Sequence, residues 1–125
     1  MESKMKIALC GGDARLLSAA SLFAKNGYGC AVWKCAPGDC GGAVRCHELR
    51  HAVDGIGAVI LPVPAFTSSG RLTCTSDERT GIDAPTLFAA LPPETKIYAG
   101  KVPDLIRRIA GEYHLPLFDY AEQEE

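Results

Sequence analysis

The segment Lys6-Ile7-Ala8-Leu9-Cys10-Gly11-Gly12-Asp13-Ala14-Arg15 decides the fold of this chain. Its first half is a short apolar run, which predicts a buried strand over residues 6–10. The two glycines end that strand, and from Asp13 to the stop at Gly27 the apolar residues recur with helical spacing. A short strand that turns through glycines into an amphipathic helix predicts the opening of a parallel α/β domain.

The rest of the chain repeats this alternation of strands and helices. Further strands are predicted over residues 30–34, 58–61, 96–99 and 117–118. A helix capped by Asp83 should pack through Leu87, Phe88 and Leu91, and a helix over residues 103–114 through Leu105, Ile106, Ile109 and Tyr113. The segment 43–54 is ambiguous: it reads as a short extended piece and then a short helix with Leu49, Ala52 and Val53 inward. The polar stretch 67–83 is long for a connection in so small a domain, which is typical of a functional loop.

These elements predict the fold class: a single doubly wound parallel sheet of about five strands, in a Rossmann- or flavodoxin-like three-layer sandwich. The order that we prefer for the five predicted strands, numbered along the chain, is 2-1-3-4-5. One domain should occupy residues 1–125, with an acidic tail, 120–125, that frays.

Composition limits the partners of this domain. Its 125 residues are 47% hydrophobic and 22% charged, which is enough apolar material for one core. Thirteen basic against 15 acidic side chains give a formal charge of −2, so nothing draws the chain generally to nucleic acid or anionic lipid. The longest apolar stretch, 58–66, is broken by Pro62 and Pro64, and no export signal precedes it. We therefore expect a cytoplasmic protein with neither a membrane nor a nucleic acid as its partner.

The cysteines and histidines do not form a recognisable site. Six cysteines in a chain without an export signal favour reduced thiols over a disulfide framework. The cluster Cys40, Cys46, His47 and His51 lacks the two paired knuckles of a zinc site, so we assign no metal ligands. No nucleophile elbow or pair of carboxylates is discernible either, and the catalytic residues stay unassigned.

Ligands of doubly wound sheets bind beyond the carboxyl ends of the strands, where the strand order reverses. Here that position is the turn after the first strand, facing the turn after the strand 58–61. Backbone N–H groups of Gly11 and Gly12 could approach an anion there, and Arg15 could pair with Asp13 or with a ligand carboxylate. The substrate-binding residues that we predict are Gly11, Gly12, Asp13, Arg15, Pro62, Thr67, Ser68 and Gly100.

Each of these residues also has a purely structural interpretation, which the sequence leaves open. The glycine pair can be a tight turn, Asp13 a helix cap, Arg15 a solvated side chain, and Thr67 and Ser68 part of an ordinary turn. A dinucleotide fingerprint would require glycine where Asp13 stands, so we predict no cofactor site in these residues.

At Lys6-Ile7-Ala8-Leu9-Cys10-Gly11-Gly12-Asp13-Ala14-Arg15, with Ile60-Leu61-Pro62-Val63 and Lys96-Ile97-Tyr98-Ala99-Gly100 beyond it, the sequence resembles the N-terminal domain of the dipicolinate synthase A subunit. The resemblance covers essentially the whole chain, and the Gly-Gly-Asp-Ala-Arg motif is its specific part. It implies sporulation and a protein that oxidises a dihydrodipicolinate-type precursor to dipicolinate. In that family NADP belongs to a second, C-terminal Rossmann domain, and a flavoprotein-like B subunit is the partner.

The chain stops near the point where this second domain would begin, so we expect a substrate-side domain that binds a small dicarboxylate and is not catalytic alone. The alternative is a stand-alone Rossmann-like module that binds a nucleotide or another protein. A reading frame that continues into a strand and G-x-G-x-x-G would favour the oxidoreductase. The sequence leaves the oligomeric state open, a homo-oligomer included.

Overall fold

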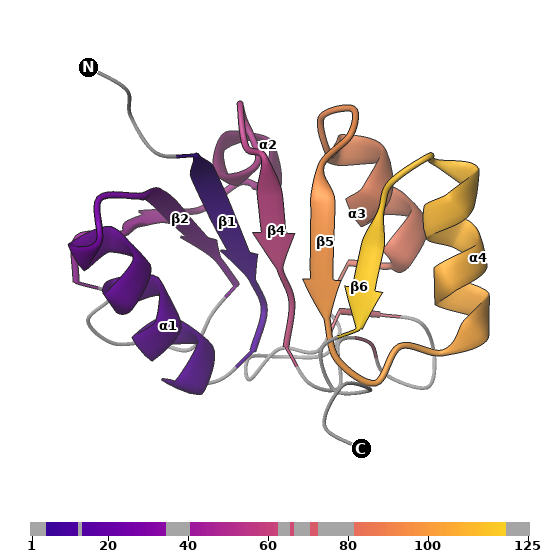
Figure 1. Cartoon of the computed structure of the whole chain (residues 1–125), viewed down its shortest axis with the longest axis horizontal. Coiled ribbons are helices and arrows are strands. Elements are labelled where there is room, and N and C mark those ends of the chain that lie inside the picture. Colours follow the sequence, from indigo (N-terminus) through magenta and orange to yellow (C-terminus); the bar gives the residue numbers. More distant parts are fainter. Residues whose placement is uncertain are drawn as a thin grey trace.

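A computed structural model describes residues 5–12, 14–34, 41–62, 66, 71–72 and 82–119. Within these ranges six parallel strands form one sheet, with helices on both faces (Figure 1). The strands are β1 (Lys6–Cys10), β2 (Gly29–Trp33), β3 (Val44–Cys46), β4 (Ala58–Ile60), β5 (Lys96–Ala99) and β6 (Leu117–Asp119). The helices are α1 (Ala14–Lys25), α2 (Leu49–Ala52), α3 (Ala84–Ala90) and α4 (Asp104–Glu112). The predicted Rossmann-like α/β class is confirmed.

The order of the strands is β3-β2-β1-β4-β5-β6. The five predicted strands lie in the predicted spatial order. The short extended piece at Val44–Cys46 adds a sixth strand, which pairs with the outer side of β2. This addition changes the flavodoxin-like order into the Rossmann order 3-2-1-4-5-6. The sequence predicted this piece only as extended and not as part of the sheet, because β3 is three residues long and its Val44 and Arg45 are exposed at the edge of the sheet.

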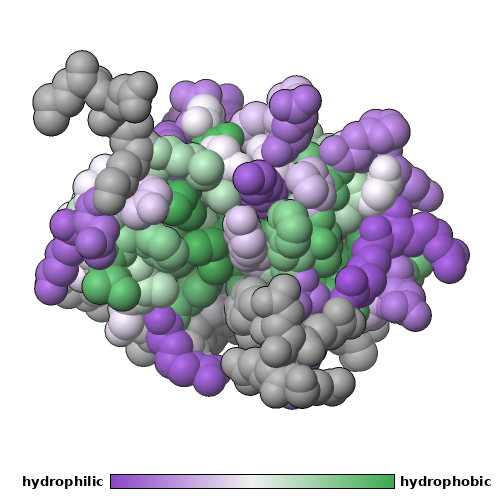
Figure 2. Space-filling model, in the orientation of Figure 1, coloured by the Kyte–Doolittle hydropathy of each residue, from purple (hydrophilic) through white to green (hydrophobic). Residues whose placement is uncertain are grey.

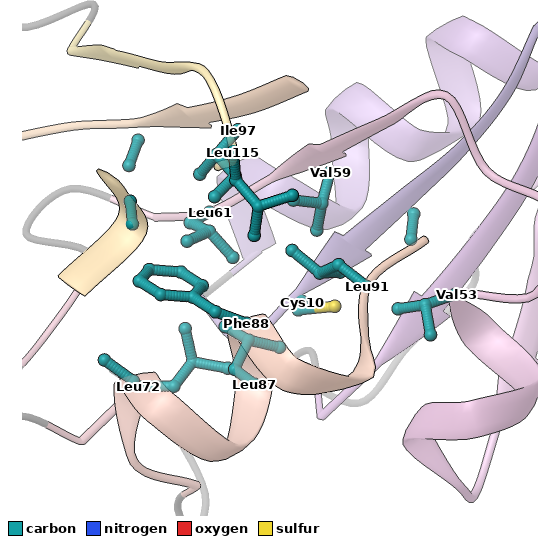
Figure 3. Close-up of a cluster of buried hydrophobic side chains, with 14 of the residues drawn as sticks. Cys10, Val53, Val59, Leu61, Leu72, Leu87, Phe88, Leu91, Ile97 and Leu115 are labelled. Atoms are coloured by element: carbon teal, nitrogen blue, oxygen red, sulfur yellow. The ribbon is translucent and has the colours of Figure 1, made fainter. Parts of the chain in front are cut away.

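The two faces of the sheet bury different side chains, as the two-residue period of a strand requires. Ile7 and Leu9 point to the face covered by α1, where they pack with Leu16, Leu17 and Ala20 of that helix. The opposite face is covered by α2, α3 and α4 and holds the larger cluster. Figure 3 shows its centre, in which Phe88 and Leu87 of α3 lie against Leu61, Ile97 and Cys10 from the strands and their ends.

Most of the predicted helix faces are confirmed. The side chain of Asp83 accepts a hydrogen bond from the Thr86 N–H at 3.1 Å and caps α3 as expected. Gly27, with φ of 91°, follows the end of α1. In α2 and just after it, Ala52 and Val53 are buried as predicted, and Leu49 is partly buried.

The prediction that Leu105 and Tyr113 of the helix 103–114 point into the core is wrong. Leu105 is 61% exposed, and Tyr113, which lies just beyond the end of α4, is 40% exposed. Ile106 and Ala110 are the buried residues of this nine-residue helix. Helical spacing is compatible with an inward stripe that contains Leu105 or with one that contains Ile106 and Ala110. The packing of α4 on the sheet selects the stripe of Ile106 and Ala110.

The described part of the long connection 67–83 is anchored to the core. Leu72 is 2% exposed, its N–H donates to the Ile82 carbonyl at 2.8 Å, and it forms an antiparallel bridge with Phe66. Arg71 forms a second bridge, with Asp83. Across the described ranges, none of the helices has the length and apolar character needed to cross a membrane.

Candidate functional site

The strand order reverses between β1 and β4, which are neighbours in the sheet although β2 and β3 lie between them in the chain. After β1 the backbone turns through Gly11 and Gly12, with φ of 77° and 83°. Only glycine adopts such angles readily, because a side chain would collide with the neighbouring carbonyl oxygen. The glycine pair is therefore required by the turn itself, whatever else it does.

Neighbouring atoms surround this turn closely. The Gly11 N–H donates to the carbonyl of Trp33 at 2.8 Å and so extends the β1–β2 ladder. The prediction that this N–H donates to an anion is therefore wrong. A Cβ atom on Gly12 would lie 2.9 Å from Leu16 Cδ2 and 3.3 Å from Pro62 Cβ. Gly12 and Pro62, two residues predicted to line one site, are thus brought together at the switch point by the pairing of β1 with β4.

Cationic residues lie within five residues of three of the strand ends at this edge of the sheet. Arg15 lies in the first turn of α1 and is exposed. Lys34 and Lys101 follow β2 and β5, and both have a left-handed backbone, with φ of 58° and 52°. Because the carboxyl ends of parallel strands share one edge, these charges make that edge favourable for an anion.

A buried carboxylate at the end of β6 fixes the neighbouring connection. Asp119 is 7% exposed and accepts hydrogen bonds from the N–H groups of Lys101 at 3.2 Å and Val102 at 2.9 Å. Its second oxygen also accepts from Nη2 of Arg107 at 3.2 Å. The side chain of Asp119 therefore holds the turn from Gly100, which is itself buried, into α4.

Asp119 is not among the site residues predicted from the sequence. A detectable signal was present, because a carboxylate that directly follows an apolar strand reaches the ligand-binding edge of a parallel sheet. Of the residues that were selected, Asp13, Thr67 and Ser68 lie outside the described residues. Gly11, Gly12, Arg15, Pro62 and Gly100 are at the predicted edge.

Among the described residues, the cysteines do not gather into a second site. Of the described cysteines, Cys10 and Cys30 are buried and Cys46 is partly buried. Within the described ranges no three His, Cys, Asp or Glu side chains come together in a way that could hold a metal ion. Cys35, Cys40 and Cys74 lie outside those ranges.

The strand order, the glycine turn at the switch point and the helices on both faces define a Rossmann-like α/β domain. More particularly, residues 6–121 match the profile of the N-terminal domain of the dipicolinate synthase A subunit, and the chain belongs to this family. A comparison with curated protein sequences finds no match.

Solved structures agree with this assignment. The A chain of dipicolinate synthase from Bacillus subtilis is 26% identical, with a TM-score of 0.77, over 95% of this chain and 41% of that one. The dipicolinate synthase A subunit from Bacillus halodurans is 15% identical, with a TM-score of 0.79, over 98% of this chain and 42% of that one. The apo form of D-mandelate dehydrogenase from Rhodotorula graminis shares the fold, at 18% identity and a TM-score of 0.57, over 90% and 33% of the two chains.

This chain spans about two fifths of the two dipicolinate synthase chains that it matches.

Proposed function

We propose that this domain is the substrate side of a dipicolinate synthase, and that it binds a small dicarboxylate at the carboxyl edge of its sheet. The reaction class is the oxidation of a dihydrodipicolinate-type precursor. The observation that carries the proposal is the presence of three cationic residues, Arg15, Lys34 and Lys101, near the carboxyl ends of the strands in a domain from this family. Ligands of open α/β sheets are bound at that position.

The charges at this edge suit such a ligand. A guanidinium can bind a carboxylate through two parallel hydrogen bonds, so Arg15 would hold one carboxylate group. Lys34 and Lys101 add positive charge at the ends of β2 and β5. The electrostatic attraction to several cations at one edge is stronger for a dianion than for a monoanion.

The glycine turn fits a pyrophosphate poorly. The Gly11 N–H is engaged by Trp33, and the space beside Gly12 is filled by Leu16 and Pro62. A dinucleotide site needs open backbone at this turn. We therefore propose that NADP is held by a second domain, that a flavoprotein-like B subunit completes the enzyme, and that this domain alone is not catalytic.

Isothermal titration and thermal unfolding of this chain with dipicolinate, picolinate and NADP test the proposal. We expect dipicolinate to bind and to raise the melting temperature, and picolinate, which lacks one carboxylate, to bind at least about tenfold more weakly. Arg15→Ala should weaken dipicolinate binding by about 10- to 100-fold, because a charged hydrogen-bonding partner is lost.

Arg108→Ala is the matched control, because Arg108 is an exposed arginine on α4. It should leave the affinity unchanged. Stabilisation by NADP with none by dipicolinate would overturn the proposal and support a nucleotide-binding module instead.

A further inference from the structure

A lysine near the carboxyl end of β5 has a backbone conformation that favours glycine. Lys101 has φ of 52°, in the left-handed region where a side chain collides with the neighbouring carbonyl oxygen. Lys101 is exposed, so packing of its side chain does not offset this strain. Strained backbone persists where the surrounding structure imposes it, and it is concentrated at ligand-binding positions.

A buried carboxylate on the neighbouring strand imposes the conformation of Lys101. Asp119 lies opposite Ala99 in the register of β5 and β6. Its Oδ1 accepts from the Lys101 N–H at 3.2 Å, and its Oδ2 accepts from the Val102 N–H at 2.9 Å. Because one carboxylate binds two successive N–H groups, the backbone at Lys101 cannot rotate without breaking a hydrogen bond. The start of the Lys101 side chain therefore has a fixed position relative to the sheet.

The carboxylate of Asp119 does not neutralise the ammonium group of Lys101. Asp119 is paired with Arg107, whose Nη2 donates to Oδ2 at 3.2 Å, and it binds Lys101 only through the backbone. Among the residues that the structure describes, none forms an ion pair or a hydrogen bond with the Lys101 ammonium group. Lys34, the other left-handed lysine at this edge, instead has its Nζ 5.6 Å from the centre of the Trp33 ring. The charge of Lys101 is thus available to a ligand.

Lys101 and Arg15 lie on the two sides of the end of β4. In the sheet β4 separates β1 from β5. Neighbouring strands lie roughly 4.8 Å apart, so the ends of β1 and β5 are about 10 Å apart. The connections that carry Arg15 and Lys101 both leave the sheet at the edge to which the strands run (Figure 1). Figure 2 shows a strongly hydrophilic side chain at the start of α1, at this same edge. A ligand beyond the end of β4 is therefore within reach of a long cationic side chain from each side.

We propose that Lys101 binds the second carboxylate of the dicarboxylate, across the ligand from the group held by Arg15, and that Asp119 is the positioning residue that fixes Lys101 for this contact. The inference rests on the proposed function, because it assigns the two carboxylates of the same ligand. The bidentate guanidinium of Arg15 takes the carboxylate that picolinate and dipicolinate share. Lys101 takes the carboxylate that picolinate lacks, so it determines the preference for a dicarboxylate.

Isothermal titration of Lys101→Gly with dipicolinate and picolinate tests the role of Lys101. We expect the affinity for dipicolinate to fall about tenfold or more and the affinity for picolinate to change less than about twofold. Because glycine relieves the left-handed strain, the melting temperature of the unliganded variant should not fall. Lys101→Arg should keep most of the preference for dipicolinate.

His114→Gly is the matched control. His114 is exposed and has φ of 58°, and it precedes β6 at the opposite edge of the sheet. The substitution relieves the same kind of strain and should leave both affinities unchanged.

Asp119→Asn tests the positioning role. Asparagine has one carbonyl oxygen for the two N–H groups, so the turn at Lys101 loses an acceptor. Loss of a negative charge would by itself strengthen the binding of a dianion. We expect the affinity for dipicolinate to fall instead, by about threefold or more, and not to fall further when Lys101 is already glycine. Arg107→Ala in both backgrounds provides the same cycle if Asp119→Asn does not fold.

The results separate this inference from the proposed function. A wild-type chain that does not bind dipicolinate would overturn both. Dipicolinate binding that is weakened by Arg15→Ala but not by Lys101→Gly would overturn only the role of Lys101, as would equal losses for dipicolinate and picolinate in Lys101→Gly. An unchanged or higher dipicolinate affinity in a folded Asp119→Asn would overturn the positioning role.

Discussion

Arg107 Nη2 donates to the buried carboxylate of Asp119 at 3.2 Å, and the same oxygen accepts from the Val102 N–H at 2.9 Å. The side chain of Asp119 is 2% exposed, whereas that of Arg107 is 34% exposed. The partners are therefore unequal: Arg107 can be hydrated without Asp119, but Asp119 depends on protein donors.

Because the two partners are unequal, truncating Asp119 and truncating Arg107 should lower the free energy of unfolding by different amounts. Asp119→Ala should lower the free energy of unfolding by about 2–3 kcal/mol, because two backbone N–H groups and a guanidinium lose their acceptor. Arg107→Ala should cost about 1 kcal/mol, because the backbone donors remain. Urea denaturation measures both, and equal costs would contradict the inequality.

Three glycine-to-alanine substitutions separate backbone strain from crowding. Gly12→Ala should cost at least about 2 kcal/mol, because φ is 83° and the new Cβ would meet Leu16 at 2.9 Å. Gly55→Ala, with φ of 72° and open space, should cost about 1 kcal/mol. Gly111→Ala, in α4 with open space, should be neutral or stabilising by up to about 1 kcal/mol. Thermal or urea unfolding gives the order, and a neutral Gly12→Ala would show that the turn has another conformation.

Two phenylalanines on opposite faces of the sheet should contribute very different amounts to the free energy of unfolding. Phe88 is 1% exposed and meets the rings of Phe66 and Tyr113 edge to face, at 6.0 and 6.5 Å. Phe88→Ala should cost about 3–5 kcal/mol, because it leaves a cavity in the larger core cluster. Phe118→Ala removes the same ring from an exposed site and should cost about 1 kcal/mol or less. Equal losses in urea denaturation would mean that Phe118 is buried in solution.

The cap of α3 predicts a pH dependence of stability. Hydrogen bonds from the Thr86 hydroxyl and then from its N–H hold the pKa of Asp83 below its ordinary value. The unfolded chain therefore takes up this proton at a higher pH than the folded chain does. The stabilisation by the Asp83 carboxylate is complete above the unfolded pKa and is lost as the pH falls through the lowered folded pKa.

Asp83→Asn keeps an acceptor for the Thr86 N–H but cannot titrate. Below about pH 5 the free energy of unfolding should therefore fall more steeply in the wild type than in Asp83→Asn. Urea denaturation of both proteins at several pH values between 3 and 7 measures this difference. If the free energy of unfolding depends on pH in the same way in both proteins, the Asp83 cap does not titrate with folding.

The sequence predicted the elements whose signal is local. The apolar run before Gly11 identified β1, the spacing after it identified α1, and Asp83 identified the start of α3. The location of the switch point was also predicted correctly, because the doubly wound order that we preferred places the first predicted strand beside the strand 58–61. The exposed three-residue strand β3 and the inward stripe of α4 could not be resolved, because neither depends on local periodicity alone.

The sequence by itself determined that this chain is a parallel α/β domain of the dipicolinate synthase family, since hydrophobic periodicity and the Gly-Gly-Asp-Ala-Arg motif are properties of adjacent residues. Only the tertiary structure decided that Asp119 meets Arg107 and that Leu16 and Pro62 close the space beside Gly12. These relationships join residues far apart in the chain. They exist only once the strands have paired and the crossovers have assigned each helix to a face.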